Sequence, residues 1–264
     1  MYGQIVIGAP GAGKSTYCSG ISQILRSLKR NVICVNLDPA NDTIPYECSV
    51  DIRELITVEE VMSRLKLGPN GALRYCMRTL RANIGWLEEK ISKFDGYLIF
   101  DFPGQLELYN SDECITEIIS QMQSWGHRFV AIHLSDSLYC SDPGKFISVL
   151  LSALSVMINL EITQINVLSK MDLINDDLPY GLEFFQNIPD ARRIAELLDE
   201  NDILKRYRNF NESICSIIND YGLVSFVFIN VSDRMSMLRL LELADKANGF
   251  SLIEADDLRN IFVK

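Results

Sequence analysis

The chain has 264 residues, of which 48% are hydrophobic, and this composition excludes a disordered chain. A chain of this length is expected to bury one large α/β core, with or without a helical insertion. Its 25 basic and 35 acidic residues give a net charge of −10, so no surface for direct nucleic-acid binding is predicted. The seven cysteines include no C-x-x-C pair and are expected to be free thiols of a reducing compartment. The N-terminus leads directly into a predicted strand, and no apolar run approaches the ~20 residues that span a bilayer, so we expect a cytoplasmic protein.

The first motif follows an apolar run at residues 4–7 that predicts a buried strand. Residues 8–15 fit the pattern G-x-x-x-x-G-K-[ST], whose backbone N–H groups surround phosphates. Lys14 is expected to reach the β- and γ-phosphates, the Ser15 hydroxyl to bind Mg²⁺, and a helix to begin at about Lys14. A chance match is the alternative, but the helical spacing of apolar residues after the motif favours a phosphate loop. The predicted nucleotide-binding residues here are Gly11, Ala12, Gly13, Lys14, Ser15 and Thr16.

A second strand is predicted at residues 31–37, and Asp38 and Pro39 follow it. A carboxylate after the end of a parallel strand lies at the edge where open α/β sheets bind ligands. Asp-Pro is also a common start of a turn. The residues alone therefore leave Asp38 divided between an active-site role and a turn.

The next segment is predicted to be mainly helical. Residues 51–56 are typical of an extended or short helical piece, and Thr57 with Glu60 forms a capping box. A tight turn is expected at residues 67–71, and one long helix over about 72–94. The span of about 57–94 is therefore expected to be an insertion.

Residues 96–101 predict a further buried strand that ends in Asp101, as in a Walker B motif. Asp101 is expected to hold Mg²⁺ directly or through a water molecule. Gly104 is expected to let the following loop approach a γ-phosphate. Helices are predicted at about 112–125 and 142–159, with a strand at 129–134 between them. His127 and His133 have no metal-ligand partners at usable spacing and are expected to be structural.

The strand predicted at residues 164–169 leads into Ser169-Lys170-Met171-Asp172, which resembles the guanine-recognition motif of GTPases. The Asp172 carboxylate could accept two hydrogen bonds from guanine, whereas adenine lacks both donors. The aliphatic part of Lys170 would lie along the base and ribose. An ordinary exposed turn is the alternative reading.

The last third is predicted to contain a helical insertion over about 176–222, a strand at 224–232 and a helix at 235–248. The insertion carries basic residues that fit a solvated helical face better than a partner-binding surface. Ser232 follows the last strand, where GTPases offer backbone to the guanine O6. Ser232 is only a weak candidate because the loop around it lacks the proline and alanine that usually accompany this position.

Five motifs in this order resemble the GPN-loop GTPases, which are SIMIBI-class P-loop NTPases, and most of all their second eukaryotic paralogue. The motifs are the phosphate loop, Asp-Pro-Ala at 38–40, Gly-Pro-Asn at 68–70, Asp-x-Pro-Gly-Gln-x-Glu at 101–107 and Ser-Lys-x-Asp at 169–172. The resemblance implies one P-loop GTPase domain over residues 1–264, with a doubly wound, mostly parallel sheet flanked by helices.

The resemblance also implies a function and partners. The family hydrolyses GTP to GDP and phosphate, as homodimers or heterodimers of paralogues, and acts in assembly and nuclear import of RNA polymerase II, and in part polymerase III. A cytoplasmic protein that shuttles to the nucleus is therefore expected. Asn70 would reach the phosphate or the attacking water in the partner's site, and Asp38 and Gln105 would orient water. Glu107 would support them or form a link to the partner's loop.

Two other functions fit the phosphate loop. A small-molecule or nucleoside kinase shares the loop and the sheet, although a kinase that uses ATP has no need of a guanine-specific carboxylate. A scaffold that binds GTP with negligible turnover is the non-enzyme alternative. Comparison of GTP with ATP binding distinguishes a GTPase from a kinase that uses ATP. A turnover assay distinguishes a GTPase from a scaffold that only binds GTP.

Overall fold

The computed structural model describes residues 1–110, 113–174, 192–198, 204–221 and 224–251. A single sheet of seven strands has the order β3-β2-β4-β1-β5-β6-β7, and every described pair of neighbours is parallel. The predicted doubly wound sheet is therefore confirmed, with no antiparallel strand among those described. The strands are β1 Tyr2–Gly8, β2 Val32–Asn36, β3 Val50–Asp51, β4 Tyr97–Asp101, β5 Arg128–Asp136, β6 Gln164–Ser169 and β7 Phe226–Phe228.

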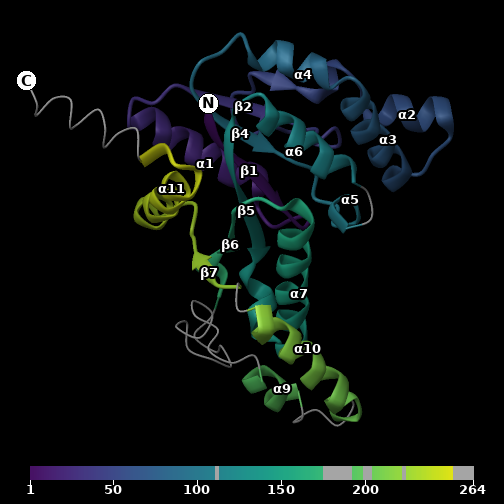
Figure 1. Cartoon of the computed structure of the whole chain (residues 1–264), viewed down its shortest axis with the longest axis vertical. Helices are drawn as coiled ribbons and strands as arrows, with labels where there is room; N and C mark the ends of the chain where they lie inside the picture. The colour runs from purple at the N-terminus through teal and green to yellow at the C-terminus, as the bar shows by residue number, and fades with distance from the viewer. Residues whose placement is uncertain (111–112, 175–191, 199–203, 222–223, 252–264) are drawn as a thin grey trace, which may run out of the picture.

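Helices cover both faces of this sheet, with α1 and α11 on the opposite side from α3 and α6 (Figure 1). Short 3₁₀ turns lie at Ile52–Glu54 (η1), Ser137–Ser141 (η2), Met171–Leu173 (η3) and Leu204–Tyr207 (η4). The described α-helices are α1 Lys14–Ser27, α2 Val58–Leu65, α3 Pro69–Ala82, α4 Ile84–Ile91, α5 Glu107–Asn110, α6 Cys114–Ser124, α7 Pro143–Leu160, α9 Arg192–Leu198, α10 Arg208–Tyr221 and α11 Arg234–Asn248.

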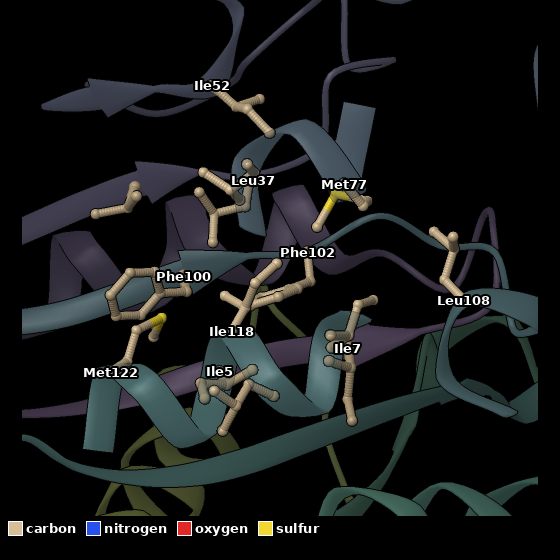
Figure 2. Packing of buried hydrophobic residues seen from close by; sticks show 14 of the residues in the cluster. Ile5, Ile7, Leu37, Ile52, Met77, Phe100, Phe102, Leu108, Ile118 and Met122 are labelled. Atoms are coloured by element: carbon tan, nitrogen blue, oxygen red, sulfur yellow. The ribbon is translucent and has the colours of Figure 1, made fainter. Parts of the chain in front are cut away.

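The alternation of side chains along the strands divides the core into two layers. In β1, Ile5 and Ile7 join the cluster under α3 and α6, whereas Val6 joins the cluster under α1 and α11. Figure 2 shows the first of these layers, in which Phe100 and Phe102 lie between the sheet and α6. Because successive side chains of a strand point to opposite faces, a strand that is apolar throughout must be covered on both sides.

The Gly-Pro-Asn segment is not the predicted tight turn. Pro69 and Asn70 are the first residues of α3, and Gly68 is its N-cap residue. Proline is suited to this place because the first N–H groups of a helix have no intrahelical partner. The helix expected at 72–94 is also interrupted at Asn83, whose backbone leaves the helical conformation between α3 and α4.

Side chains cap the starts of two other helices, and the first of these caps was predicted from the sequence. Thr57 caps α2 by accepting a hydrogen bond from the N–H of Glu60 at 3.3 Å. Asp142 caps α7 and accepts from the N–H of Lys145 at 2.8 Å. By length and composition alone α7, with 18 residues, could cross a membrane, and in the described chain it is the only such helix. Its buried face packs in the core through Phe146, Leu150 and other side chains, as in a core helix.

The predicted insertion at 176–222 is described only in part. Residues 176–191 lie outside the described residues, as do the side chains of Arg192 and Arg193. In the described part, α9 and α10 pack with α7 in a separate apolar cluster, and Lys205, Arg206 and Arg208 are exposed. Exposure of these cations agrees with the predicted solvated face.

Candidate nucleotide-binding site

The loop between β1 and α1 has the backbone that its glycines predict. Gly11 and Gly13 have φ values of +79° and +89°, in the left-handed region that other residues rarely adopt. The N–H of Ala12 donates to the Ala9 carbonyl at 3.2 Å, which closes the turn. A Cβ atom on Gly8 would lie 2.1 Å from the Leu134 carbonyl oxygen, so no side chain fits at this position.

The loop borders an open cleft of about 480 Å³ at the carboxyl edge of the sheet. The cleft brings together the ends of β1, β2, β4 and β6, as expected for a ligand site in a parallel α/β sheet. Predicted site residues that line it are Gly11, Gly13, Lys14, Ser15, Thr16, Asp38, Gly104, Gln105 and Lys170. Residues not predicted for the site are Pro10, Ala40, Asn41 and Leu73.

Six predicted residues are absent from this lining among the described residues. Ala12 and Asp101 are buried behind it, whereas Asn70, Glu107, Asp172 and Ser232 are exposed. Glu107 is the first residue of α5, a short helix that the sequence does not predict. The structure therefore brings most of the phosphate-side residues and Lys170 together, and leaves Asn70, Glu107, Asp172 and Ser232 at the surface.

The Lys14 side chain is buried between two acids. Its ammonium donates to the Ala9 carbonyl at 3.3 Å. Burial lowers the pKa of Lys14, and the charges of Asp101 and Asp38 oppose this effect. Burial also raises the pKa of both carboxyls, while Lys14 acts in the opposite direction on each of them. The protonation of Lys14 and that of the two carboxyls are therefore coupled at the base of the cleft.

The two carboxylate oxygens of Asp101 differ in their hydrogen bonds to the described residues, and the nearby Ser15 hydroxyl helps to lower the pKa of this carboxyl. Tyr46 donates its hydroxyl to Oδ2 at 3.0 Å, whereas Oδ1 is buried with no hydrogen-bond partner among the described residues. Asn41 donates to the Ser15 hydroxyl oxygen at 3.0 Å. Sequence reasoning missed both Tyr46 and Asn41. The sequence offered only one indication of a role for them, which is that both follow the strand β2. The fold is what brings them to Ser15 and Asp101.

Gly104 packs directly against the phosphate loop. A Cβ atom at this position would lie 2.6 Å from Lys14 Nζ and 3.0 Å from the Pro10 nitrogen. Gln105, the next residue, is partly exposed and lines the cleft. The loop after β4 can therefore lie against the phosphate loop only because residue 104 has no side chain.

The base side of the cleft is built from three strand ends. Ser169 donates to the carbonyls of Ala12 and Ser135 at 2.8 and 3.1 Å, which ties the Ser-Lys-x-Asp segment to the phosphate loop. The N–H of Met171 donates to the Ile229 carbonyl at 3.4 Å, so the segment also adjoins the end of β7. The Ser232 N–H is held by Asn230 Oδ1 at 2.9 Å.

His133 lies inside β5 and is buried. It is 2% exposed, and its Nδ1 has no hydrogen-bond partner in the described part of the chain. Burial, with a smaller effect of Lys14, lowers the pKa of His133 to about 4. The folded protein therefore holds this imidazole neutral at physiological pH.

A pH-dependent contribution to stability follows from His133. The unfolded chain binds more protons than the folded chain between about pH 6.5 and about pH 4, so this contribution is complete above pH 6.5 and is lost as the pH falls toward 4. His133→Gln is expected to remove up to about 3 kcal/mol of pH-dependent change in the free energy of unfolding. Urea unfolding between pH 4 and 7.5 measures it. His127→Gln serves for comparison: burial also lowers the pKa of His127, but this side chain is only half-buried, so its removal should change the pH dependence less. Identical pH slopes for wild type and His133→Gln would contradict the prediction.

The chain is similar in sequence to known proteins over most of its length. A family model described as "Conserved hypothetical ATP binding protein" matches residues 6–250. GPN-loop GTPase 2 of Danio rerio is 46% identical over 263 residues, covering 98% of this chain and 84% of the relative. The chain belongs to the GPN-loop GTPase family. The resemblance found in the sequence is therefore confirmed, and the protein is a GTP-binding GTP hydrolase.

Two further similarities agree with this assignment. A GPN-loop GTPase 2 homolog of Dictyostelium discoideum is 45% identical over 252 residues, covering 94% of this chain and 80% of that one. The apo crystal structure of a GTPase from Pyrococcus abyssi has a TM-score of 0.77 and 24% identity, covering 93% of this chain and 97% of that chain. That structure supports the fold. The family model's description names ATP, whereas these relatives are named GTPases, so the choice of purine depends on the base side of the cleft.

Proposed function

We propose that this GPN-loop GTPase is a magnesium-dependent dimeric switch. The observation that supports the magnesium site is the buried Oδ1 of Asp101, on the strand next to the phosphate loop, which has no hydrogen-bond partner among the described residues. The nearby Ser15 hydroxyl helps to lower the pKa of the same carboxyl, so the two side chains lie together. Carboxylate and hydroxyl oxygens are ligands that Mg²⁺ prefers. Asp101 and Ser15 would hold the ion, which when bound would neutralise charge on the phosphates.

The protein residues would divide the work of hydrolysis. Lys14 would stabilise negative charge that develops on the β- and γ-phosphates. Asp38 and Gln105 would orient the attacking water, since both line the cleft at the strand ends near the phosphate loop. Glu107, exposed at the start of α5, would support them from the side. The products are GDP and phosphate.

We propose that Asn70 acts in the site of the partner subunit. Residues 68–70 are exposed at the first turn of α3, whereas Leu73, one turn later, borders the cleft of its own chain. Within the described lining of that cleft Asn70 has no place. The Asn70 carboxamide is therefore free to meet the phosphate or water of a second subunit, either another copy or a paralogue.

We propose RNA polymerase II, and in part polymerase III, as the client whose assembly and nuclear import the switch serves. Family resemblance supports this role, and a cytoplasmic protein that shuttles to the nucleus would fit it. RNA polymerase subunits or assembly factors would then be partners. Direct nucleic-acid and membrane contacts are not proposed, in keeping with the net charge of −10.

A complementation assay tests the shared site. Asn70→Ala is expected to lower GTP turnover about a hundredfold with little change in GTP affinity, because a carboxamide donor to the transition state is lost. Lys14→Met is expected to be inactive as well. In a mixed dimer, the Asn70→Ala subunit has an intact phosphate loop and receives Asn70 from the Lys14→Met subunit, so mixing the two inactive variants should restore turnover.

The outcomes separate the alternatives. Restored turnover supports Asn70 in trans, and two variants that stay inactive in a demonstrated mixed dimer contradict it. Wild-type protein that binds GTP with Mg²⁺ but does not turn it over, alone or with a paralogue, would instead indicate a GTP-locked scaffold. Retention of GTP without Mg²⁺ at equal affinity would contradict the magnesium site.

A further inference from the structure

Asp136 has no role in the proposed hydrolysis, yet it is bound to the base side of the cleft. It is the last residue of β5 and lies beside Ser169 in the parallel register of β5 and β6. Its Oδ2 accepts a hydrogen bond from Lys170 Nζ at 2.7 Å, and the two side chains are 16% and 35% exposed. Lys170 lines the nucleotide cleft, whereas Asp136 is not among the residues that the structure places in its lining.

The Asp136 carboxylate is itself fixed in place. Its second oxygen, Oδ1, accepts the N–H of Leu138 at 3.0 Å and so caps the 3₁₀ turn η2. One oxygen is therefore tied to backbone and the other to Lys170. Because both oxygens have partners, the carboxylate cannot rotate away from the ammonium without losing a hydrogen bond.

The neighbouring residue holds the same lysine by its backbone. Ser137 is fully buried, and its hydroxyl donates to the Lys170 carbonyl at 3.0 Å. This carbonyl belongs to a residue with φ +59° and ψ +39°, a left-handed conformation that is uncommon for a side chain such as lysine. Such conformations persist only where surrounding contacts enforce them. Lys170 is the N-cap residue of η3, which carries Asp172.

We propose that Asp136, with Ser137, is the positioning element of the guanine subsite: it holds the Lys170 stem alongside the base and fixes the left-handed turn that presents Asp172. Asp136 acts through Lys170 and makes no contact with nucleotide. The inference rests on the proposed placement of guanine against Lys170 and Asp172. It adds two residues that the motif itself does not contain.

Calorimetry with two probes tests this role. Magnesium-GDP reports on the whole site, and magnesium tripolyphosphate reports on the phosphate side alone. Asp136→Asn keeps a side chain that can cap η2 but removes the charge. It is expected to weaken GDP binding about five- to tenfold and to leave tripolyphosphate binding unchanged. Asp142→Asn is the matched control, since Asp142 caps α7 in a similar way and contacts no described residue of the cleft lining.

A double-mutant cycle separates positioning from a purely structural effect. In a Lys170→Met background, which keeps the apolar stem, Asp136→Asn is expected to change GDP affinity less than about twofold. Additive losses, equal losses for both probes, or wild-type GDP affinity in Asp136→Asn would each overturn the proposal.

A second variant covers the case in which Asp136→Asn does not fold. Ser137→Ala removes only the hydrogen bond to the Lys170 carbonyl and is expected to weaken GDP binding about threefold, again without effect on tripolyphosphate. No selective loss for GDP in this variant would then overturn the proposal. Failure of the wild-type protein to bind GDP would refute the guanine site itself, which is a distinguishable result.

Discussion

Replacing Lys14 with methionine is expected to lower the turnover of GTP about a thousandfold, because the buried cation at the base of the cleft faces the charge that develops during phosphoryl transfer. Methionine fills nearly the same space, so the packing of α1 is retained. The variant also leaves Asp38 and Asp101 without the cation that lowers the pKa of each carboxyl. Both carboxyls are then expected to bind protons at higher pH, which further reduces their ability to assist hydrolysis and bind Mg²⁺.

Single-turnover hydrolysis measures this effect independently of product release. GTP affinity should be determined in parallel with a fluorescent analogue, since loss of the ammonium weakens phosphate binding as well. Lys246→Met is a suitable control because Lys246 is exposed on α11 and pairs only with Glu242 in the described contacts. A Lys14→Met protein that hydrolyses GTP within tenfold of wild type would show that the phosphate loop is not the centre of the reaction.

Replacing Asp172 with asparagine is expected to change the base preference from guanine to xanthine. The carboxylate of Asp172 would accept hydrogen bonds from N1–H and the exocyclic amine of guanine, whereas xanthine has a carbonyl in place of that amine. A carboxamide can donate to this carbonyl. Because Asp172 is exposed in the described structure, we expect a moderate loss of GDP affinity, about 30-fold, with a similar gain for XDP.

Competition binding with GDP, XDP and ADP measures the change. ADP serves as an internal control, since adenine lacks both donors in wild type and should bind weakly to both proteins. Equal binding of GDP and ADP by the wild-type protein would agree with the ATP-binding description of the family model rather than with the relatives' names. An Asp172→Asn protein with unchanged GDP affinity would place the purine elsewhere.

Local signals in the sequence determined much of the fold. Gly8 is required because the chain there lies against a carbonyl oxygen, and Gly11 and Gly13 are required because the backbone there is left-handed. The glycine pattern therefore predicted the phosphate loop without tertiary information. Apolar strands that end in Asp101 or are followed by Asp38 and Lys170 likewise predicted a parallel sheet with its site at one edge. The capping signal at Thr57 predicted a helix start that the structure reproduces.

The Gly-Pro-Asn segment shows where local reasoning fails. Pro-Asn-Gly favours a turn and a helix start almost equally, and the burial of the α3 face, including Leu73 and Met77, selects the helix. No residue within the segment carries that information. Whether Asn70 meets a second subunit depends on how two subunits associate, and the residues around Asn70 do not predict this either.

By itself, the sequence determined which residue types could bind phosphate, metal and guanine, because each chemistry requires particular side chains at short spacing. Only the tertiary structure decided that Tyr46 meets Asp101, that Asn41 meets Ser15 and that Asp136 meets Lys170. These pairs are separated by 55, 26 and 34 residues. They form because parallel strands bring their carboxyl ends to one edge, and no local pattern encodes which strands become neighbours.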